Sequence, residues 1–490
     1  MSNGNVKVNT VFNTLKTVST ILFNLITFPY IARILLTENV GKVNFSISFV
    51  NYFALIASLG VTTYAIRECA KRKDNAKGLE DISSQIFSIN FYMTFLSYIA
   101  LALVLVLFRS FDSYRVLIII LSTNILFTTL GTDWINSAME DFKYIAIRTL
   151  AFQVLSLIAV FVFVRNIGDY YKYAIITVIS TSGANILNIF YRRRFCRIKL
   201  FSIKRIEWKV HMSPILFLFV MILAQTIFSN ADITMLGLIK DDVEVGLYST
   251  AHKVENIISQ VISSIAWVMI PKLSRMFENN DYEGINNQLS NIFGFYMVLG
   301  LPCFVGAIIT APDIIDIIAG TEYAGAAMPL QILMFSFLFS LVGGSFLGNM
   351  VLLPSGNEKR YMFVCCAATV VNVIANLILI PLWGARAAAG TTAFCSLFIA
   401  SLLLFLKDKR IKINGILKNV LSPLIGSVAI VGFCLIMQRV IDGLALRMIA
   451  CIVGSIILYA IVLAIFKNKF MIWVIHFCTG KLKKNHDERC

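Results

Sequence analysis

The chain has 490 residues, of which 58% are hydrophobic and only 14% are charged, against about 25% charged residues in an average soluble domain. Its 43 lysines and arginines outnumber its 27 acidic residues, which gives a formal net charge of +16. Apolar runs of about 20 residues recur throughout, which excludes a soluble globular protein and predicts an all-α integral membrane protein. Because the basic residues lie in short loops between these runs, membrane orientation and lipid headgroups explain the charge better than nucleic acid does.

Fourteen candidate membrane helices follow one another along the chain. We expect them at approximately 13–36, 43–66, 84–108, 115–135, 145–164, 171–190, 212–239, 245–270, 286–309, 327–352, 361–381, 386–406, 418–438 and 445–466. An even number of spans puts both termini on one side of the membrane. Most of the lysines and arginines lie in the loops of that side, so both termini are predicted to be cytoplasmic.

The longest basic connector divides the chain into two lobes. The predicted organisation is an N-terminal six-helix lobe at 1–190, a basic cytoplasmic linker at 191–211, a C-terminal six-helix lobe at 212–410, two additional spans at 411–466 and a basic amphipathic cytoplasmic tail at 467–490. The apolar run after Lys16 is too long for a cleaved signal, so it is predicted to remain as the first span.

Polar residues fall on one side of the first span. Thr20, Asn24 and Thr27 are spaced i, i+4 and i+7, which places them on one helical face. Pro29 is expected to kink this span and to redirect its outer end, which carries Arg33.

The second span carries a similar polar stripe, which includes Ser48 and Asn51. Arg67 follows near the cytoplasmic end of this span, and Arg148 lies at a similar depth in the fifth. Both arginines are candidates for the inner mouth of a cavity, and the alternative is that they reach the lipid headgroups.

The seventh and eighth spans return to this pattern about 205 residues later. Gln225, Ser229 and Asp232 fall in the register of the polar residues of the first span, and Asn256 is identical to its counterpart Asn51. The chain is therefore predicted to contain two related halves.

The corners between the paired spans also match, as Val40-Gly41 and Val245-Gly246, and Lys253 and Gln260 extend the stripe of the eighth span. Six spans per half is an even number, so the halves form a parallel repeat, and such folds bind substrate at the repeat interface. We expect the matching polar faces to line a shared, water-filled cavity. The alternative is that they are ordinary helix–helix contacts.

Charged residues inside the spans favour a functional role. A charge at the bilayer centre costs about 2.5–3.5 kcal/mol, so Asp232 and Lys253 are predicted to face the cavity, with a mutual ion pair as the alternative. Cationic groups at several depths are suited to a diphosphate ligand. The predicted substrate-binding residues are Lys16, Thr20, Asn24, Thr27, Arg33, Ser48, Asn51, Arg67, Arg148, Gln225, Ser229, Asp232, Lys253, Asn256 and Gln260.

Catalytic motifs are absent from the sequence. It contains no phosphate-binding loop of the G-x-x-x-x-G-K-[ST] type, no Ser-His-Asp arrangement and no H-E-x-x-H, and its ten cysteines lack metal-ligand spacing. We therefore predict a transporter rather than an enzyme, with no cofactor and no metal. Coupling to protons or sodium ions is left open, and a membrane-embedded transferase or polymerase is a minor alternative.

Two stretches resemble the Wzx-type polysaccharide flippases of bacteria. These are "FPYIARILLTENVGKVNFSISFVNYFALIASLGVTTYAIRECAKRKD", which begins at Phe28, and "DWINSAMEDFKYIAIRTLAFQ", at Asp133 to Gln153. The resemblance extends to about residue 410. It implies the superfamily that also holds multidrug antiporters of the MATE type and lipid II flippases of the MurJ type, and with it a V-shaped pair of six-helix lobes around a central cavity.

The resemblance also implies a function. The expected cargo is an undecaprenyl-diphosphate-linked oligosaccharide repeat unit, moved from the inner to the outer leaflet of the bacterial plasma membrane for surface polysaccharide synthesis. A polysaccharide polymerase and an initiating glycosyltransferase are the implied partners, besides membrane lipids. Two alternatives remain open, a cation or drug antiporter of the MATE type and a lipid II flippase.

Overall fold

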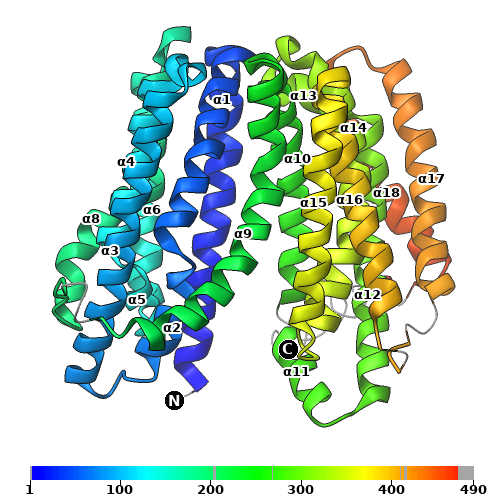
Figure 1. Cartoon of the computed structure of the whole chain (residues 1–490). Helices are drawn as coiled ribbons and strands as arrows, with labels where there is room; N and C mark the ends of the chain where they lie inside the picture. Colours follow the sequence, from blue (N-terminus) through cyan, green and yellow to red (C-terminus); the bar gives the residue numbers. More distant parts are fainter. Residues whose placement is uncertain are drawn as a thin grey trace, which may run out of the picture. The chain divides into compact units, whose positions relative to one another are not determined.

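The computed structural model describes residues 3–201, 206–267, 269–408, 410–412, 416–468 and 470–472. Within these residues the chain is helical and has no strand, and 12 of its helical segments are long and apolar enough to cross a membrane (Figure 1). The predicted all-α membrane fold is confirmed. The chain clusters into two compact units, Met1–Gly246 and Leu247–Cys490.

The first two predicted spans form a single long helical element, α1 (Asn3–Ser58), which contains one break. Leu36 has φ 63° and ψ 173°, a backbone region that is essentially restricted to glycine, so the helix stops there and starts again. Pro29 lies inside the helix, seven residues before the break. Leu59 and Gly60 also adopt positive φ, and they separate α1 from α2 (Val61–Ala70).

The remaining elements of unit 1 comprise helices at the predicted spans and several short helices between them. They are α3 (Ala76–Leu107), η1 (Arg109–Tyr114), α4 (Arg115–Gly131), α5 (Trp134–Ala138), α6 (Phe142–Phe163), η2 (Ile167–Asp169), α7 (Tyr170–Val178), the π-helical η3 (Ile179–Gly183), α8 (Ala184–Tyr191), η4 (Arg192–Arg194) and α9 (Trp208–Ile239). Side chains cap several of them, and Asn166 and Asp169 form a capping box at η2. Asn75 accepts the Gly78 N–H at the start of α3, and Asp141 accepts the Tyr144 N–H at the start of α6.

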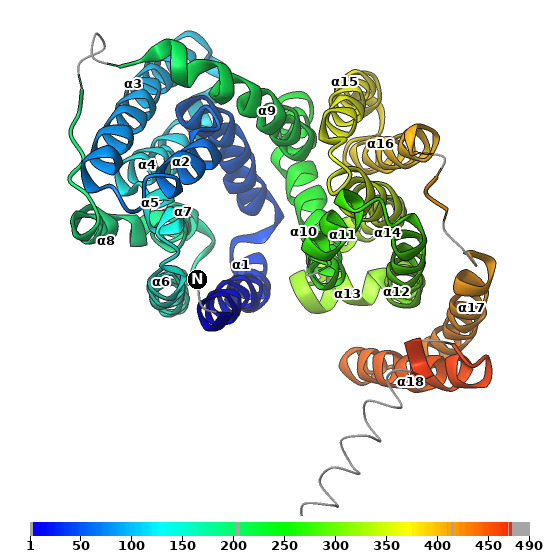
Figure 2. The ribbon, with the colours of Figure 1, turned by 90° about the horizontal axis from the view of Figure 1, so that it is seen from below.

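Two helices organise the packing of unit 1. Helix α1 packs against α3, α4, α6 and α9, and α4 packs in addition against α3, α7 and α8 (Figure 2). Polar side chains on these helices are therefore brought against residues that lie far away in the sequence.

The predicted linker runs along α3 as an extended strap, residues 195–201. The Ser84 hydroxyl accepts the Lys199 N–H at 3.0 Å, and the Ser88 hydroxyl accepts the Phe201 N–H at 2.8 Å. Tyr92, one further turn along, donates to the Phe201 carbonyl at 2.9 Å. Burial raises the pKa of the Cys196 thiol in this strap, so it remains protonated at neutral pH.

The boundary between the compact units differs from the predicted one. Helix α9 packs against α1 and α2, so it belongs to unit 1, and the division lies after Gly246 instead of at 191–211. The sequence placed α9 in the second lobe because the basic linker precedes it. The predicted organisation into two lobes, each with six spans, stays a prediction.

Unit 2 contains α10 (Asp242–Trp267, whose first turn belongs to unit 1), α11 (Ile270–Glu278), α12 (Tyr282–Ile309), α13 (Ala311–Ala319), η6 (Thr321–Ala326), α14 (Ala327–Ser340), the π-helical η7 (Leu341–Leu352), α15 (Glu358–Trp383), α16 (Ala385–Leu406), α17 (Ile416–Val440) and α18 (Leu444–Ile465). The two additional C-terminal spans belong to this unit. Arg447 on α18 forms a bidentate pair with Asp313 on α13, and the Tyr459 hydroxyl donates to the Val298 carbonyl on α12 at 2.7 Å.

The count of fourteen spans is not confirmed as such. The first of the 12 apolar segments, Leu15–Ala70, covers two predicted spans, and α10 is not among the 12 because many of its residues are polar. The short helices α5, α11 and α13 were not predicted. The predicted amphipathic tail at 467–490 lies largely outside the described residues.

The two matching Val-Gly corners make a reciprocal contact within unit 1. A Cβ atom added to Gly41 would lie 1.8 Å from the Asp242 carbonyl oxygen, and one added to Gly246 would lie 2.2 Å from the Thr37 carbonyl oxygen. Thr37 and Asp242 each lie four residues before one of the two glycines. Only glycine permits backbones to approach this closely.

Candidate functional site

The polar face of the first part of α1 is joined to α6. Gln153, a buried residue of α6, donates to the Thr20 hydroxyl at 2.8 Å and accepts from the Ser19 hydroxyl at 3.0 Å. Thr20 also donates to the Lys16 carbonyl of its own helix. Sequence reasoning missed Gln153, because a single glutamine in an apolar run gives no sign of a partner more than a hundred residues away.

The other residues predicted for this helix differ in exposure. Thr27 is buried and donates to the Phe23 carbonyl one turn earlier. The side chains of Lys16 and Asn24 are half-buried, and Arg33 is exposed. Lys16, Thr20 and Asn24 therefore offer a cation, a hydroxyl and an amide that are partly accessible along one helix.

The second part of α1 meets α9 through a hydrogen-bonded cluster. Ser48, which is 1% exposed, donates to the Asn230 carbonyl at 2.9 Å and lies 3.0 Å from the Thr234 hydroxyl. Asn51 donates to the Asn230 side chain at 3.1 Å. Ser48 and Asn51 thus form an interhelical contact within unit 1, which was the alternative interpretation of the polar stripes.

The predicted residues on α9 divide into two groups. Gln225 and Ser229 are exposed, whereas Asp232 is only 3% exposed. Asn230 and Thr234, which flank Asp232 in the sequence, face α1. The chain therefore places a carboxylate inside an apolar helix next to its contact with α1, where a coupling or gating role is chemically possible.

Arg67 lies at the surface, a position that is compatible with the alternative interpretation that it reaches the lipid headgroups. Its side chain is 57% exposed, pairs with Glu68 at 3.3 Å and lies over the Tyr64 ring. Lys71 and Arg72 pair with the same carboxylate, at 2.8 Å and 3.1 Å.

Arg148 occupies a buried polar network. Its side chain is 5% exposed, and its guanidinium donates to the Asp133 carboxylate at 2.5 Å and to the Ala184 carbonyl at 3.1 Å. Asn136 and Asn188, both fully buried, also donate to the Asp133 carboxylate. This geometry connects α5, α6 and α8 through a buried ion pair, and a role of Arg148 in binding the cargo stays a prediction.

In unit 2 the predicted residues lie on α10 with a neighbour that sequence reasoning missed. Asn256 donates to the His252 Nε2 atom at 3.1 Å, and Gln260 donates to Asn256 at 3.5 Å. Lys253 is half-buried, and Glu255 is 8% exposed with its carboxylate 3.5 Å from the His252 ring. The signal for His252 was present, because it precedes Asn256 and Gln260 by one and two turns on the same face.

The chemical capacity of these groups is binding rather than bond cleavage. Unit 1 presents hydroxyls, amides and a lysine on α1 and α9, and unit 2 presents amides, a histidine and a lysine on the more polar α10, groups that are suited to sugar hydroxyls and phosphate oxygens. No group of three or more histidine, cysteine or acidic residues among the described residues could hold a metal ion. The shared cavity, in contrast, stays a prediction.

Comparison with known proteins adds a family and a fold. A family model described as "Polysaccharide biosynthesis protein" matches residues 6–277. The putative O-antigen transporter of Escherichia coli K12 is 20% identical over 395 residues, which cover 80% of this chain and 94% of that protein. A probable low-salt glycan biosynthesis flippase, Agl15 of Haloferax volcanii, is 28% identical over 152 residues, 31% of each chain.

Two solved structures share the fold. The lipid II flippase MurJ in an inward closed conformation superposes with a TM-score of 0.74 at 18% identity, over 94% of this chain and 99% of that chain. An inward-facing multidrug resistance MATE family transporter of the MOP superfamily superposes with a TM-score of 0.61 at 12% identity, over 86% and 98% of the two chains.

Proposed function

The chain belongs to the polysaccharide biosynthesis protein family, and on this basis we propose that it is a membrane flippase for a lipid-linked oligosaccharide. The observation that carries the proposal is the family match over more than half of the chain, which includes α1, α9 and α10 with their polar side chains. The names of the bacterial and archaeal relatives, an O-antigen transporter and a glycan flippase, support the same class of cargo.

The finer proposal concerns the carrier and the direction of transport. We infer that the cargo is an undecaprenyl-diphosphate-linked repeat unit that moves from the inner to the outer leaflet of a bacterial plasma membrane by alternating access. Amides and hydroxyls such as those of Asn24 and Asn256 would bind sugar hydroxyls, and Lys16 and Lys253 would bind the diphosphate. The prenyl chain would remain in lipid. The polymerase and glycosyltransferase partners stay predictions.

Asp232 is the proposed coupling or gating group. Asp232 is 3% exposed within an apolar helix, and charged residues inside membrane spans usually mark ion or substrate pathways. Whether the ion is a proton or sodium is decided by measuring flipping under separate proton and sodium gradients.

Lys253 gives the sharpest single-residue test. Lys253→Gln removes the charge and keeps most of the side-chain length, so surface polysaccharide is expected to be lost while the amount of membrane protein stays normal. Lys240→Gln, at the exposed end of α9, is the matched control and is expected to leave polysaccharide unchanged. Normal polysaccharide with Lys253→Gln would exclude the proposed role of Lys253 in binding the diphosphate.

The flippase proposal itself is tested in cells that lack the protein. Lipids are extracted and analysed by mass spectrometry, with the inner and outer leaflets distinguished by the access of an impermeant glycan-oxidising reagent. A completed, diphosphate-linked repeat unit is expected to accumulate in the inner leaflet, and its mass identifies the sugar. If no lipid-linked sugar accumulates and the cells become sensitive to cationic dyes instead, the protein is an antiporter and the flippase proposal is overturned.

A further inference from the structure

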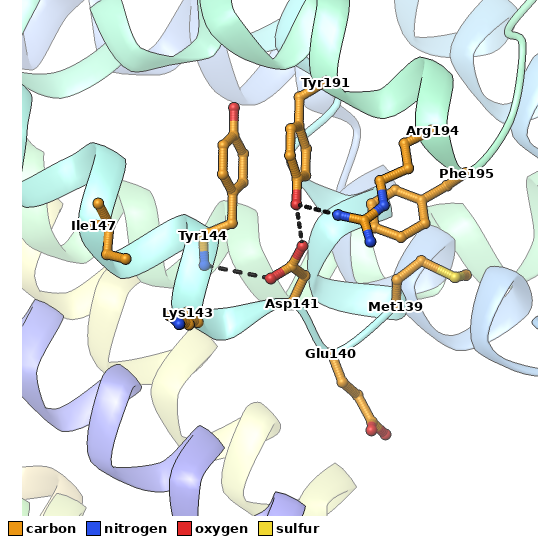
Figure 3. Close-up of a pocket in the computed structure, with 9 residues that line it drawn as sticks. All are labelled: Met139, Glu140, Asp141, Lys143, Tyr144, Ile147, Tyr191, Arg194 and Phe195. Atoms are coloured by element: carbon orange, nitrogen blue, oxygen red, sulfur yellow. Dashed lines mark hydrogen bonds between the residues drawn. The ribbon is translucent and has the colours of Figure 1, made fainter.

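A pocket of about 540 Å³ lies at the end of unit 1 that carries Arg192, Arg193 and Arg194. It is formed by the turn before α6, the first turns of α6, and the end of α8 with the residues that follow (Figure 3). The lining residues are Met139, Glu140, Asp141, Lys143, Tyr144, Ile147, Tyr191, Arg194 and Phe195. The pocket is therefore placed where two apolar helices end, at the level expected for lipid headgroups.

This pocket is separate from the polar face described above. Tyr144 lines the pocket and Gln153 contacts Thr20 on α1, and nine residues of α helix correspond to two and a half turns. The two side chains therefore leave α6 on opposite sides. None of the residues predicted for the cargo is among the described residues that line the pocket.

A rigid aromatic wall forms the back of the pocket. The rings of Tyr144 and Tyr191 stack with centroids 3.5 Å apart and an interplanar angle of 7° (Figure 3). The Tyr191 hydroxyl donates to the Asp141 carboxylate at 2.6 Å, and the Arg194 guanidinium donates to that hydroxyl at 3.4 Å. These contacts fix Tyr191 between one acidic and one basic group.

Both signs of charge occur near this wall, although the Glu140 side chain points away from Asp141 and the stacked rings (Figure 3). Lys143 and Arg194 have exposed side chains, and Glu140 and Asp141 add two carboxylates within the same short segment of chain. The backbone of Glu140 has φ +59°. Its carboxylate lies 3.7 Å from the Lys73 Nζ atom in a solvent-exposed ion pair, and because such a pair contributes little stability, Glu140 can exchange Lys73 for another cation at little cost. Two basic and two acidic residues line the pocket, so a ligand that carries groups of both signs matches it better than a simple anion does.

An apolar track leads away from the pocket along α6. Ile147, Leu150, Val154 and Ile158 are 54%, 39%, 50% and 55% exposed, and their spacing of three to four residues keeps them on one side of the helix. On α8, Phe190 is 64% exposed. A water-soluble ligand would make no use of this track, whereas a lipid with its headgroup in the pocket would lay an acyl chain along it.

We propose that this pocket binds the headgroup of a zwitterionic aminophospholipid. Lys143 and Arg194 contact the phosphodiester, and Glu140 and Asp141 accept hydrogen bonds from the primary ammonium. An anionic headgroup without an amine would bring a further negative charge to the Glu140 and Asp141 carboxylates and would offer them no ammonium. A headgroup with a quaternary ammonium has no N–H group, so it cannot donate hydrogen bonds to these carboxylates. The proposal does not depend on the cargo of the flippase.

The test uses the full chain in detergent. The purified protein is equilibrated with micelles that contain equal amounts of phosphatidylethanolamine, phosphatidylglycerol and phosphatidylcholine with identical acyl chains, and retained lipids are counted by native mass spectrometry. Phosphatidylethanolamine is expected to be retained in preference to the other two. Equal retention of phosphatidylethanolamine and phosphatidylglycerol, or a preference for phosphatidylglycerol, would overturn the proposal in favour of a simple basic surface.

Variants locate the binding to the pocket. The double substitution Lys143→Gln with Arg194→Gln is expected to lower phosphatidylethanolamine retention at least about tenfold, because both charge-assisted contacts to the phosphate are lost. Glu140→Gln is expected to reduce the preference for phosphatidylethanolamine over phosphatidylglycerol. Lys77→Gln, an exposed lysine at the start of α3, is the control and should change neither value. Unchanged retention in the double variant, or an equal loss in the control, would refute the assignment.

Discussion

At the scale of single residues, Arg148 carries its charge in the interior of unit 1, where acceptors from Asp133 and Ala184 surround the guanidinium. The sequence indicated only a cation near one end of a span. The sequence could not show that the Arg148 side chain is buried, because its partners come from α8 and from the turn before α5. The same limitation applies to Thr20, whose position on a polar face was predicted but whose partner Gln153 was not.

Asp133→Asn tests the structural role of this network. The substitution keeps the shape of the side chain but leaves the Arg148 guanidinium buried without its counter-charge, so the free energy of unfolding is expected to fall by about 3 kcal/mol. Thermal unfolding of the purified protein in detergent measures the change. Asp112→Asn, which breaks the exposed pair with Arg115, should cost less than about 1 kcal/mol. A stable Asp133→Asn protein that has lost transport would instead assign Arg148 to the cargo.

The two corner glycines give a second residue-level prediction. Gly41→Ala and Gly246→Ala each place a Cβ against a backbone carbonyl of the other corner, which cannot move as a flexible side chain does. Each is expected to destabilise the protein by about 1–3 kcal/mol. Gly306→Ala, inside α12, meets no atom within 4 Å and should be neutral or stabilising. Melting temperatures of the three variants compare these outcomes, and a stable Gly41→Ala protein would show that the corners separate easily.

At the scale of elements, the positions of the helices were predictable because about 20 apolar residues in a membrane protein have few alternatives to a helix. The breaks were less predictable. Leu36 ends a helix in a backbone region that leucine rarely occupies, so nothing in the residue type announces it. The long π-helical segment η7 and the short helix α13 depend on tertiary packing that the local sequence does not reveal.

The strap is bound to α3 by hydrogen bonds that the basic composition of the linker did not predict. Replacing both Ser84 and Ser88 by alanine removes the acceptors of two strap amides, each worth about 1 kcal/mol. Hydrogen exchange at Lys199 and Phe201 is therefore expected to become faster by one to two orders of magnitude, as mass spectrometry of the exchanged protein would show. Thr181→Ala, an exposed threonine bonded to its own helix, is the control. Unchanged exchange at both amides would mean that the apolar side chains alone hold the strap.

At the scale of the whole molecule, the sequence predicted a membrane protein of many spans and a two-part organisation, and the structure confirms the first. The predicted lobes of six spans each stay a prediction. The compact units divide after Gly246, because α9 packs on α1, and this contact is visible only in three dimensions.

Orientation in the membrane yields the last prediction. The segment from Thr310 to Ala326 contains no lysine or arginine, so it is expected outside the cell, and the basic loop around Lys77 is expected inside. In intact cells, an impermeant maleimide should label a protein carrying Glu322→Cys but label one carrying Lys77→Cys only after permeabilisation. The unsubstituted chain provides the background from the native cysteines. The reverse pattern would invert the topology.

The reciprocal contact of the two glycine corners has the symmetry of a two-fold interface. Gly41 meets the residue four positions before Gly246, and Gly246 meets the residue four positions before Gly41, so exchanging the two corners leaves the contact unchanged. In a two-fold dimer of half-length chains, one glycine used twice would make this contact, as in every isologous interface. If the predicted repeat arose by duplication and fusion of such a chain, the same contact in one chain requires two glycines.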